Sequence, residues 1–426
     1  MNGEEVIDVA QLKVGMFIHL DVGWMRHPFP LSSFRVTSED QLVVIRRLGV
    51  KQVRWSPEKS QLEAPEAAKP GDVGAPSAVG EVDPAALAAE QVAQARRAAL
   101  KAERDLLAIC EAQYGEAAEA LTSLMGLVLK DPRLAGQQAV QLTRSLLDKM
   151  LVSQELNLRV LNEAAGDRAA AHALNVSLVS LLLGRACGLG DDELLALGTG
   201  ALLHDVGKLD VDSRYRHRSD QFNAHEMQAY QDHVAKGVRM AQQMVLTPDA
   251  LAVIAQHHEH ADATGFPQRL NGERMHALAR IVALVNRFDG LCNPAVASKG
   301  LTPHEALSLM FAQGRSRFDA TLLNAFIRMM GVYPPGSIVQ LTDDRFAIVV
   351  AVNSSRPLKP RVVVYDPAIP ADEALSLNLE ENSTLGIRRS LRSADLPRPA
   401  TFYLRPRARF AYFFHGADAP AGAAAC

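Results

Sequence analysis

The chain has 426 residues, 48% of them hydrophobic, so it exceeds one typical domain and can bury at least one large core. Its formal net charge of −3 excludes a global field that would hold it to DNA, RNA or an anionic membrane. Its cysteines, at 110, 187, 292 and 426, are far apart, which excludes a disulfide framework and CxxC metal sites and suits a reducing compartment.

The N-terminal part predicts a small α+β domain over residues 1–58. Residues 37–48 have the periodicity of an amphipathic helix that Ser38 could cap, and Gln52–Trp55 is typical of a strand. The acidic N-terminus lacks the basic and apolar regions of a signal peptide. The longest apolar run, residues 176–183, is too short to span a membrane. We therefore expect a cytoplasmic protein without a membrane span.

The rest of the chain is predicted to be mainly α. Residues 59–83, rich in Ala, Pro and Gly, indicate a disordered linker. Pro84 can open a helix, and the following Ala-rich sequence predicts a helical connector over 84–150, which could pair two copies into a homodimer. Helical periodicity continues through 151–330 and predicts an all-helical domain. Residues 331–370 predict a small β segment with a hairpin, and 371–426 form a C-terminal extension.

Histidines in the helical body are arranged in a way that core packing does not require. His204 and Asp205 are adjacent at a predicted helix end, with Gly207 and the cation of Lys208 directly after them. A carboxylate can join two metal ions because each of its oxygens can bind one. Further imidazoles stand at His172, at His233, and at the pair His257 and His258. A lone histidine is usually a surface or core residue, but imidazoles together with a carboxylate suit Fe, Mn, Co, Ni or Zn.

These motifs resemble those of the HD-GYP subfamily of HD metal-dependent phosphohydrolases. Residues 202–208 (LLHDVGK) are similar to its HD-x-GK signature, and residues 257–267 (HHEHADATGFP) to its HHE-xx-DG-x-GYP run. Residues 233–237 match the intervening H-xxx-G, and His172 matches the first histidine. Residues 14–17 and 27–29 are similar to the small domain that often precedes HD-GYP in bacterial proteins, and residues 331–337 to the segment that commonly follows it.

The resemblance implies a phosphodiesterase that opens the bacterial messenger cyclic di-GMP to linear pGpG, sometimes onward to GMP. It implies two divalent transition-metal ions (Fe, Mn, Ni, Co or Zn) that activate water for attack on the phosphate. Lys208 would stabilise the attacked phosphate. The implied ligands are His172 and His204 for one ion, His233, His257 and His258 for the other, and Asp205 for both; Gly265, Phe266 and Pro267 would form the loop beside the substrate.

Several positions depart from the subfamily pattern. Asn286 replaces the Asp that normally completes the shell of the first ion, so it is a weaker candidate ligand. Phe266 replaces Tyr in the substrate loop, and Ala263 replaces a Gly there, which restricts a positive-φ turn. Ala295 takes the place of an Arg that grips the dinucleotide, which leaves Lys299 as the nearest cation.

A fifth departure is Arg168, which stands where members with three metals carry Glu, and it argues against a third ion. Together the changes leave two other functions open. One is a signalling module that binds a nucleotide or a partner protein without cutting, with the N-terminal domain passing on its state. The other is an HD phosphohydrolase that acts on a different nucleotide.

Overall fold

The computed structural model describes residues 5–22, 27, 29, 33–60, 84–151, 156–162, 167–314, 316–353, 356, 358–382 and 384–416. The linker predicted over 59–83 lies outside the described residues from position 61 onward, as does the end of the C-terminal extension from 417. The described residues fall into two compact units, one that ends at Ala102 and one that begins at Glu103. Each is described by itself.

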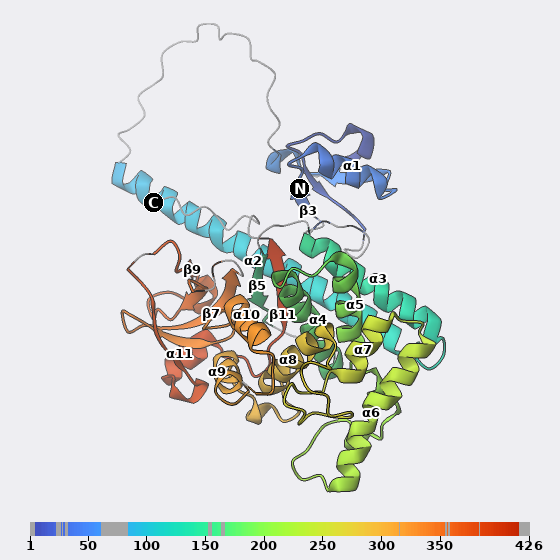
Figure 1. The fold of residues 1–426 in the computed structure, drawn as a ribbon. Helices are drawn as coiled ribbons and strands as arrows, with labels where there is room; N and C mark the ends of the chain where they lie inside the picture. The colour runs from blue at the N-terminus through green and yellow to red at the C-terminus, as the bar shows by residue number, and fades with distance from the viewer. Residues whose placement is uncertain are drawn as a thin grey trace, which may run out of the picture. The chain divides into compact units, whose positions relative to one another are not determined.

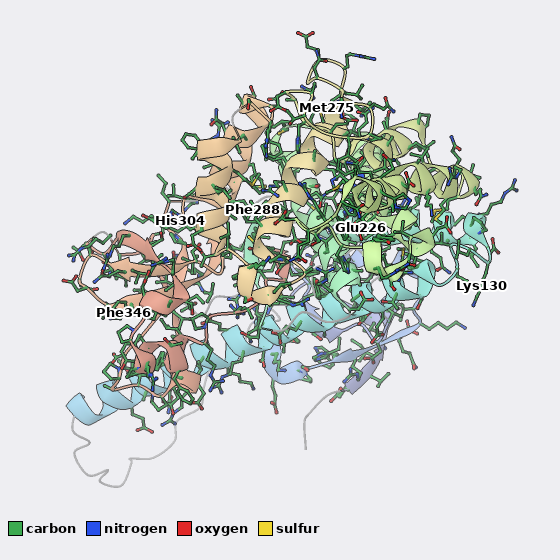
Figure 2. The ribbon with its side chains drawn as sticks, turned by 90° about the horizontal axis from the view of Figure 1, so that it is seen from below. Lys130, Glu226, Met275, Phe288, His304 and Phe346 are labelled. Carbon is green, nitrogen blue, oxygen red and sulfur yellow. The ribbon has the colours of Figure 1, made fainter. Side chains whose placement is uncertain are left out.

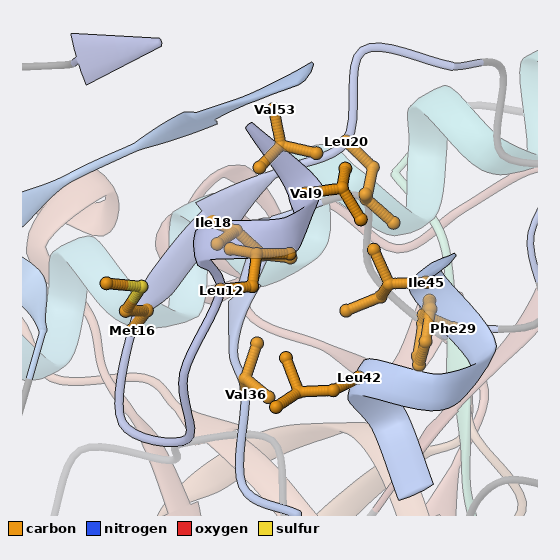
Figure 3. Close-up of a cluster of buried hydrophobic side chains, with 10 residues drawn as sticks. All are labelled: Val9, Leu12, Met16, Ile18, Leu20, Phe29, Val36, Leu42, Ile45 and Val53. Carbon is orange, nitrogen blue, oxygen red and sulfur yellow. The ribbon is translucent and has the colours of Figure 1, made fainter. Parts of the chain in front are cut away.

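In the first unit, the described strands form one antiparallel sheet in the order β1 (Glu5–Asp8), β4 (Gln52–Trp55), β2 (Phe17–His19) and β3 (Ser33–Arg35). Helix α1 (Glu39–Arg47) begins after Ser38, whose hydroxyl accepts the Gln41 N–H at 3.3 Å. Side chains of α1, the strands and the short helix η1 (Val9–Gln11) gather into the apolar core shown in Figure 3. The predicted α+β domain, its helix and its last strand are thus confirmed.

This unit continues past the expected boundary at residue 58. A short helix, η3 (Pro57–Lys59), follows β4, and the Ser60 hydroxyl accepts the Phe17 N–H at 2.8 Å. The same hydroxyl lies 2.8 Å from the Trp55 indole nitrogen. Ser60 therefore anchors the segment after β4 to the sheet, although the composition of that segment resembles that of the linker.

The second unit is mainly helical, as predicted (Figure 1). Helices α4, α5, α7 and α8 pack against one another and form the centre of the bundle, and α3 and α6 contact this group. The bounds of the helices are α2 (Pro84–Met125, which begins in the first unit), α3 (Pro132–Leu151), α4 (Arg168–Ala186), α5 (Asp191–Leu203), η4 (Val206–Asp210), η5 (Ser213–Tyr215), α6 (Ala224–Gln243), α7 (Pro248–Gln256), α8 (Ala277–Cys292), η6 (Ala297–Lys299), α9 (Pro303–Gln313) and α10 (Ala320–Met330).

Helix α4 is the core helix of the bundle. It is long and apolar enough to cross a membrane by length and composition, yet 72% of its apolar window is buried inside the protein. Its apolar residues are thus accounted for by packing against α5 and α8. Phe288 of α8, labelled in Figure 2, packs edge-on against Phe326 of α10 with ring centroids 5.2 Å apart. These contacts fix the helices that carry the histidines.

The described β structure of this unit is larger than predicted. The hairpin expected after residue 331 is present as β6 (Ile338–Leu341) and β7 (Phe346–Asn353), and β8 (Arg361–Val364) pairs with β7. The sheet also takes in β9 (Ser376–Asn378), β10 (Ile387–Leu391) and β11 (Tyr412–Gly416) from the predicted extension, which holds the short helices η7 (Ala371–Glu373) and η8 (Ser393–Asp395) and the helix α11 (Arg398–Leu404).

One stretch of the predicted all-helical domain is a strand. β5 (Leu156–Val160) lies between β7 and β11 and pairs antiparallel with both. The expectation of helix was wrong here because a five-residue segment is too short to show a period, and its hydrogen-bond partners lie far away in the sequence. The sheet packs at one flank of the bundle, where β11 contacts α4 and α3.

Candidate metal centre

A close approach between two backbone segments places Asp205 beside His233. Helix α5 ends at Leu203, so that His204 and Asp205 lie at the turn into η4. A Cβ atom on Gly207 would lie 1.9 Å from the carbonyl oxygen of His233 and 2.4 Å from the backbone nitrogen of Gly237. Only glycine at position 207 therefore allows η4 to pack against α6 at this distance. Gly207 of the HD-x-GK motif and Gly237 of the H-xxx-G motif therefore both lie at this close contact.

The six residues expected as ligands form two overlapping groups. One contains His172, His204 and Asp205, and the other contains Asp205, His233, His257 and His258; within each group the ligand atoms lie within 4.8 Å of one another. Asp205 belongs to both. Its Oδ2 lies 3.4 Å from His204 Nε2, and its Oδ1 lies 3.4 Å from His233 Nε2. One carboxylate thus turns a different oxygen toward each group.

Hydrogen bonds fix the tautomer of the buried imidazoles. The Nδ1 atoms of three of them lie beside backbone carbonyl oxygens three residues earlier: His204 with Ala201 at 2.6 Å, His233 with Tyr230 at 2.6 Å, and His257 with Ile254 at 2.8 Å. A carbonyl only accepts, so each Nδ1 donates and each Nε2 carries a lone pair. The same bonds hold the rings so that Nε2 faces the centre.

The Nε2 lone pairs of neighbouring imidazoles face one another with no proton between them. His172 Nε2 lies 3.2 Å from His204 Nε2, and His233 Nε2 lies 3.3 Å from His257 Nε2. Two nitrogens that share an ion at about 2.0–2.1 Å from each are about 3 Å apart, as found here. Asp205 Oδ1 is buried and has no hydrogen-bond partner among the described residues. A cation in each group would satisfy these atoms, so the donor set fits metal ions.

The protonation states suit metal binding. Burial, followed by the neighbouring imidazoles, holds the pKa values of His257 and His258 well below their usual value, and burial also lowers the pKa of His233. Neutral imidazole is the form that binds a metal. Burial alone would raise the pKa of Asp205, but Lys208 and then His204 outweigh it and hold that pKa well below its usual value. The Lys208 ammonium lies 2.6 Å from Asp205 Oδ2.

Asp289 supports the first group from behind, a role that we did not assign from the sequence. It is 2% exposed, and its Oδ2 accepts the Nδ1–H of His172 at 2.6 Å. Its Oδ1 accepts from the side-chain amides of Asn175 at 2.8 Å and Asn293 at 2.9 Å. Both asparagines also bind the backbone of Phe410. Asp289 follows Asn286 by three residues on α8, and this spacing was the feature of the sequence that could have indicated its role.

The loop after His258 packs closely against the second group. The Phe266 ring stacks on the His258 ring with centroids 4.4 Å apart. Buried Glu259 anchors the loop, since its carboxylate accepts the N–H groups of Gln268 at 2.6 Å and Leu270 at 2.9 Å. A Cβ atom on Gly265 would lie 2.5 Å from the carbonyl oxygen of His258. Ala263 takes the left-handed conformation, with φ +61°, that the sequence led us to doubt for this residue.

A cleft of about 1110 Å³ opens onto both groups. Its lining includes the remaining predicted site residues Lys208, Phe266, Asn286 and Lys299, whereas Gly265 of the same loop as Phe266 is buried. Pro267, which follows a cis peptide bond, and Gly265 are not part of the lining. Arg168 also lines the cleft, where its guanidinium is hydrogen-bonded to the His217 ring. A cation thus lies at the position where the resemblance to members with three metals implied a Glu.

Comparison with known proteins agrees with this geometry. Residues 146–322 match the family described as HD domain, and residues 5–150 match a domain of unknown function, DUF3391. The chain is 28% identical, over 84% of each chain, to the cyclic di-GMP phosphodiesterase PA4108 of Pseudomonas aeruginosa. This chain therefore carries an HD domain preceded by a DUF3391 domain. The HD match contains all six candidate ligands, and the DUF3391 match overlaps it over residues 146–150.

Two further proteins are similar to parts of this chain. The 3'3'-cGAMP-specific phosphodiesterase 2 of Vibrio cholerae is 28% identical over 43% of this chain and 36% of its own length. Among solved structures, Bd1817, an HDG"Y"P protein of Bdellovibrio bacteriovorus, covers 76% of this chain and 98% of its own, with 14% identity and a TM-score of 0.39.

Proposed function

We propose that this protein is a metal-dependent phosphodiesterase that hydrolyses cyclic di-GMP to linear pGpG, and to GMP if a second cut follows. The observation that carries the proposal is Asp205, whose two oxygens face two separate groups of histidines. The similarity to PA4108 over most of both chains supports the choice of substrate. The cleft is also large enough for a dinucleotide, since small-molecule pockets usually measure about 300–1,000 Å³.

The residues have distinct parts in this proposal. His172 and His204 would hold one divalent ion, His233, His257 and His258 the other, and Asp205 would bridge them. Bound ions of this kind lower the pKa of water and offset charge on an attacked phosphate. Lys208, on the cleft wall beside Asp205, would neutralise a phosphate oxygen. Phe266 would form the wall of the substrate site beside His258, with Gly265 and Pro267 shaping its loop.

Asn286 is proposed as a weak further ligand of the first group. It lines the cleft on α8, and its amide oxygen can bind a cation without contributing charge. Both groups share the charge of Asp205, but the first group offers two imidazoles and the second offers three. We therefore propose that the first ion is held less tightly than the second.

The test is hydrolysis of cyclic di-GMP by the full chain, purified without oxygen and analysed for metal content. We expect two transition-metal ions per chain and release of pGpG, and we expect Asp205→Asn to lose both ions and the activity. His225→Ala is the matched control, because His225 is exposed and lies outside both groups. Turnover that persists unchanged in Asp205→Asn would refute the proposal. A wild-type protein with both ions that leaves the dinucleotide uncut would point to the binding-module alternative.

Two sequence predictions remain part of this proposal. We place the protein in the cytoplasm, where a cyclic dinucleotide messenger acts. We also propose that two copies pair through the Ala-rich first part of α2, and that the N-terminal unit passes a signal from a protein partner. Sedimentation of the full chain tests the pairing, and a monomer at all concentrations would refute it.

A further inference from the structure

The cleft carries more positive charge than the metal centre requires. Besides Lys208, it is lined by the side chains of Arg218, Arg287 and Arg317. None of these three arginines makes a side-chain hydrogen bond or ion pair with a described residue. The chain as a whole has a net charge of −3, so this concentration of cations is local. Unpaired arginines that line a cleft together are an arrangement suited to an anionic ligand.

The three arginines are held near one another and near the second histidine group. Arg287 follows Asn286 on α8, and the carbonyl oxygen of Arg317 accepts the N–H of Ala261 at 2.8 Å. Ala261 belongs to the same loop as the ligand His258. The like charges of Arg218, Arg287 and Arg317 repel one another across the cleft that they line together. Bound anion would remove this repulsion.

A small side pocket lies beside two of the three arginines. Arg287 and Arg317 also line a small side pocket with the apolar side chains of Leu291, Met310 and Phe318. Its volume of about 30 Å³ admits a group of about the size of a water molecule, so a guanine ring does not fit there. Arg287 and Arg317 also line the main cleft, where their guanidinium groups can meet an anion. Arg binds phosphate through paired N–H groups.

We infer that Arg218, Arg287 and Arg317 bind the second phosphate of a cyclic dinucleotide while its first phosphate lies at the metal centre. The inference rests on the proposed function for the identity of the ligand. The inference also explains how the dinucleotide could be bound although Ala295 replaces an Arg and Lys299 is exposed. Arg287 on α8 and Arg317 after α9 would supply the cations that bind the phosphate instead. These arginines would select ligands with two phosphates over ligands with one.

The test compares a ligand with two phosphodiesters and a ligand with one. Arg287→Gln, Arg317→Gln and the double variant are assayed as full chains on cyclic di-GMP and on bis(p-nitrophenyl) phosphate. We expect each single change to raise the KM for cyclic di-GMP about 10- to 100-fold, the usual effect of losing a hydrogen bond to a charged group. The loss on the single diester should be far smaller. Arg239→Gln, an exposed arginine of α6 outside the cleft, is the matched control.

Calorimetric binding of cyclic di-GMP to the same proteins separates this inference from the proposed function. Equal losses on both compounds, or no loss on either, would overturn the inference. Binding that depends on the arginines without cleavage would overturn the proposed function and uphold the anion site. A wild-type protein that cleaves the single diester but neither binds nor cleaves cyclic di-GMP would overturn both. Arg287→Lys should recover only part of the binding, because Lys keeps the charge but loses the paired N–H groups.

Discussion

Replacing Asp289 with Asn tests whether a buried carboxylate behind the site controls one ion and not the other. Asp289 Oδ2 accepts the His172 Nδ1–H at 2.6 Å, and Oδ1 accepts from Asn175 and Asn293. An amide of the same size presents one acceptor and one donor. Its N–H₂ group must therefore face either His172 or the two asparagines, all of which donate. The His172 ring loses its fixed orientation in the first case, and the network behind it breaks in the second.

The size of the effect follows from this contact. A hydrogen bond to a charged group contributes about 1.5–3 kcal/mol net. Loss of a residue that orients a metal-binding histidine usually costs about 10- to 100-fold in metal affinity, or about 1.4–2.7 kcal/mol. Asp289 contacts no histidine of the second group in the described residues. We therefore expect Asp289→Asn to weaken one of the two ions by about 10- to 100-fold and to leave the other unchanged.

The assay is calorimetric titration of metal-stripped full-length protein with Mn²⁺, run beside thermal unfolding in chelator to report folding without metal. Asp249→Asn is a matched control, because Asp249 forms a histidine contact outside the site, with His276 Nε2 at 3.2 Å. Two ions bound by Asp289→Asn with wild-type affinity would refute the reasoning. Equal weakening of both ions would assign Asp289 a role in folding instead.

Three further changes have defined outcomes. Ala263→Gly should raise the free energy of unfolding by up to about 1 kcal/mol, because relief of the left-handed φ of +61° exceeds the entropic cost of glycine; a lower urea midpoint would contradict the strain argument. Gly207→Ala should lose metal binding in titration, since its Cβ would lie 1.9 Å from the His233 carbonyl oxygen; wild-type metal content would contradict this. Buried Lys149 has its pKa lowered, chiefly by burial, to about 7, so the unfolded chain binds more protons between about pH 7 and pH 10 and stability should rise with pH across that window. Lys149→Met should flatten this rise in urea unfolding at pH 7 and pH 9, and an unchanged slope would assign it to another group.

The sequence pattern was sufficient for the helical fold and for the choice of candidate ligands. Adjacent His204 and Asp205, the pair His257 and His258, and single histidines on other helices stand out because apolar packing does not require them. Helical periods are local and repeat over many residues, so the bundle could be predicted. The five-residue strand β5 could not, because its partners β7 and β11 come from the far end of the chain.

The sequence by itself determined which atoms are available for metal binding: imidazole nitrogens, the Asp205 carboxylate, and an amide at Asn286 where the subfamily has an acid. Only the tertiary structure decided how they are supported. It placed Asp289 against His172, brought Phe410 from the C-terminal segment to the two asparagines, and gathered Arg218, Arg287 and Arg317 around one cleft. These contacts join residues far apart in the chain, and their partners are set by packing, which no local period of the sequence records.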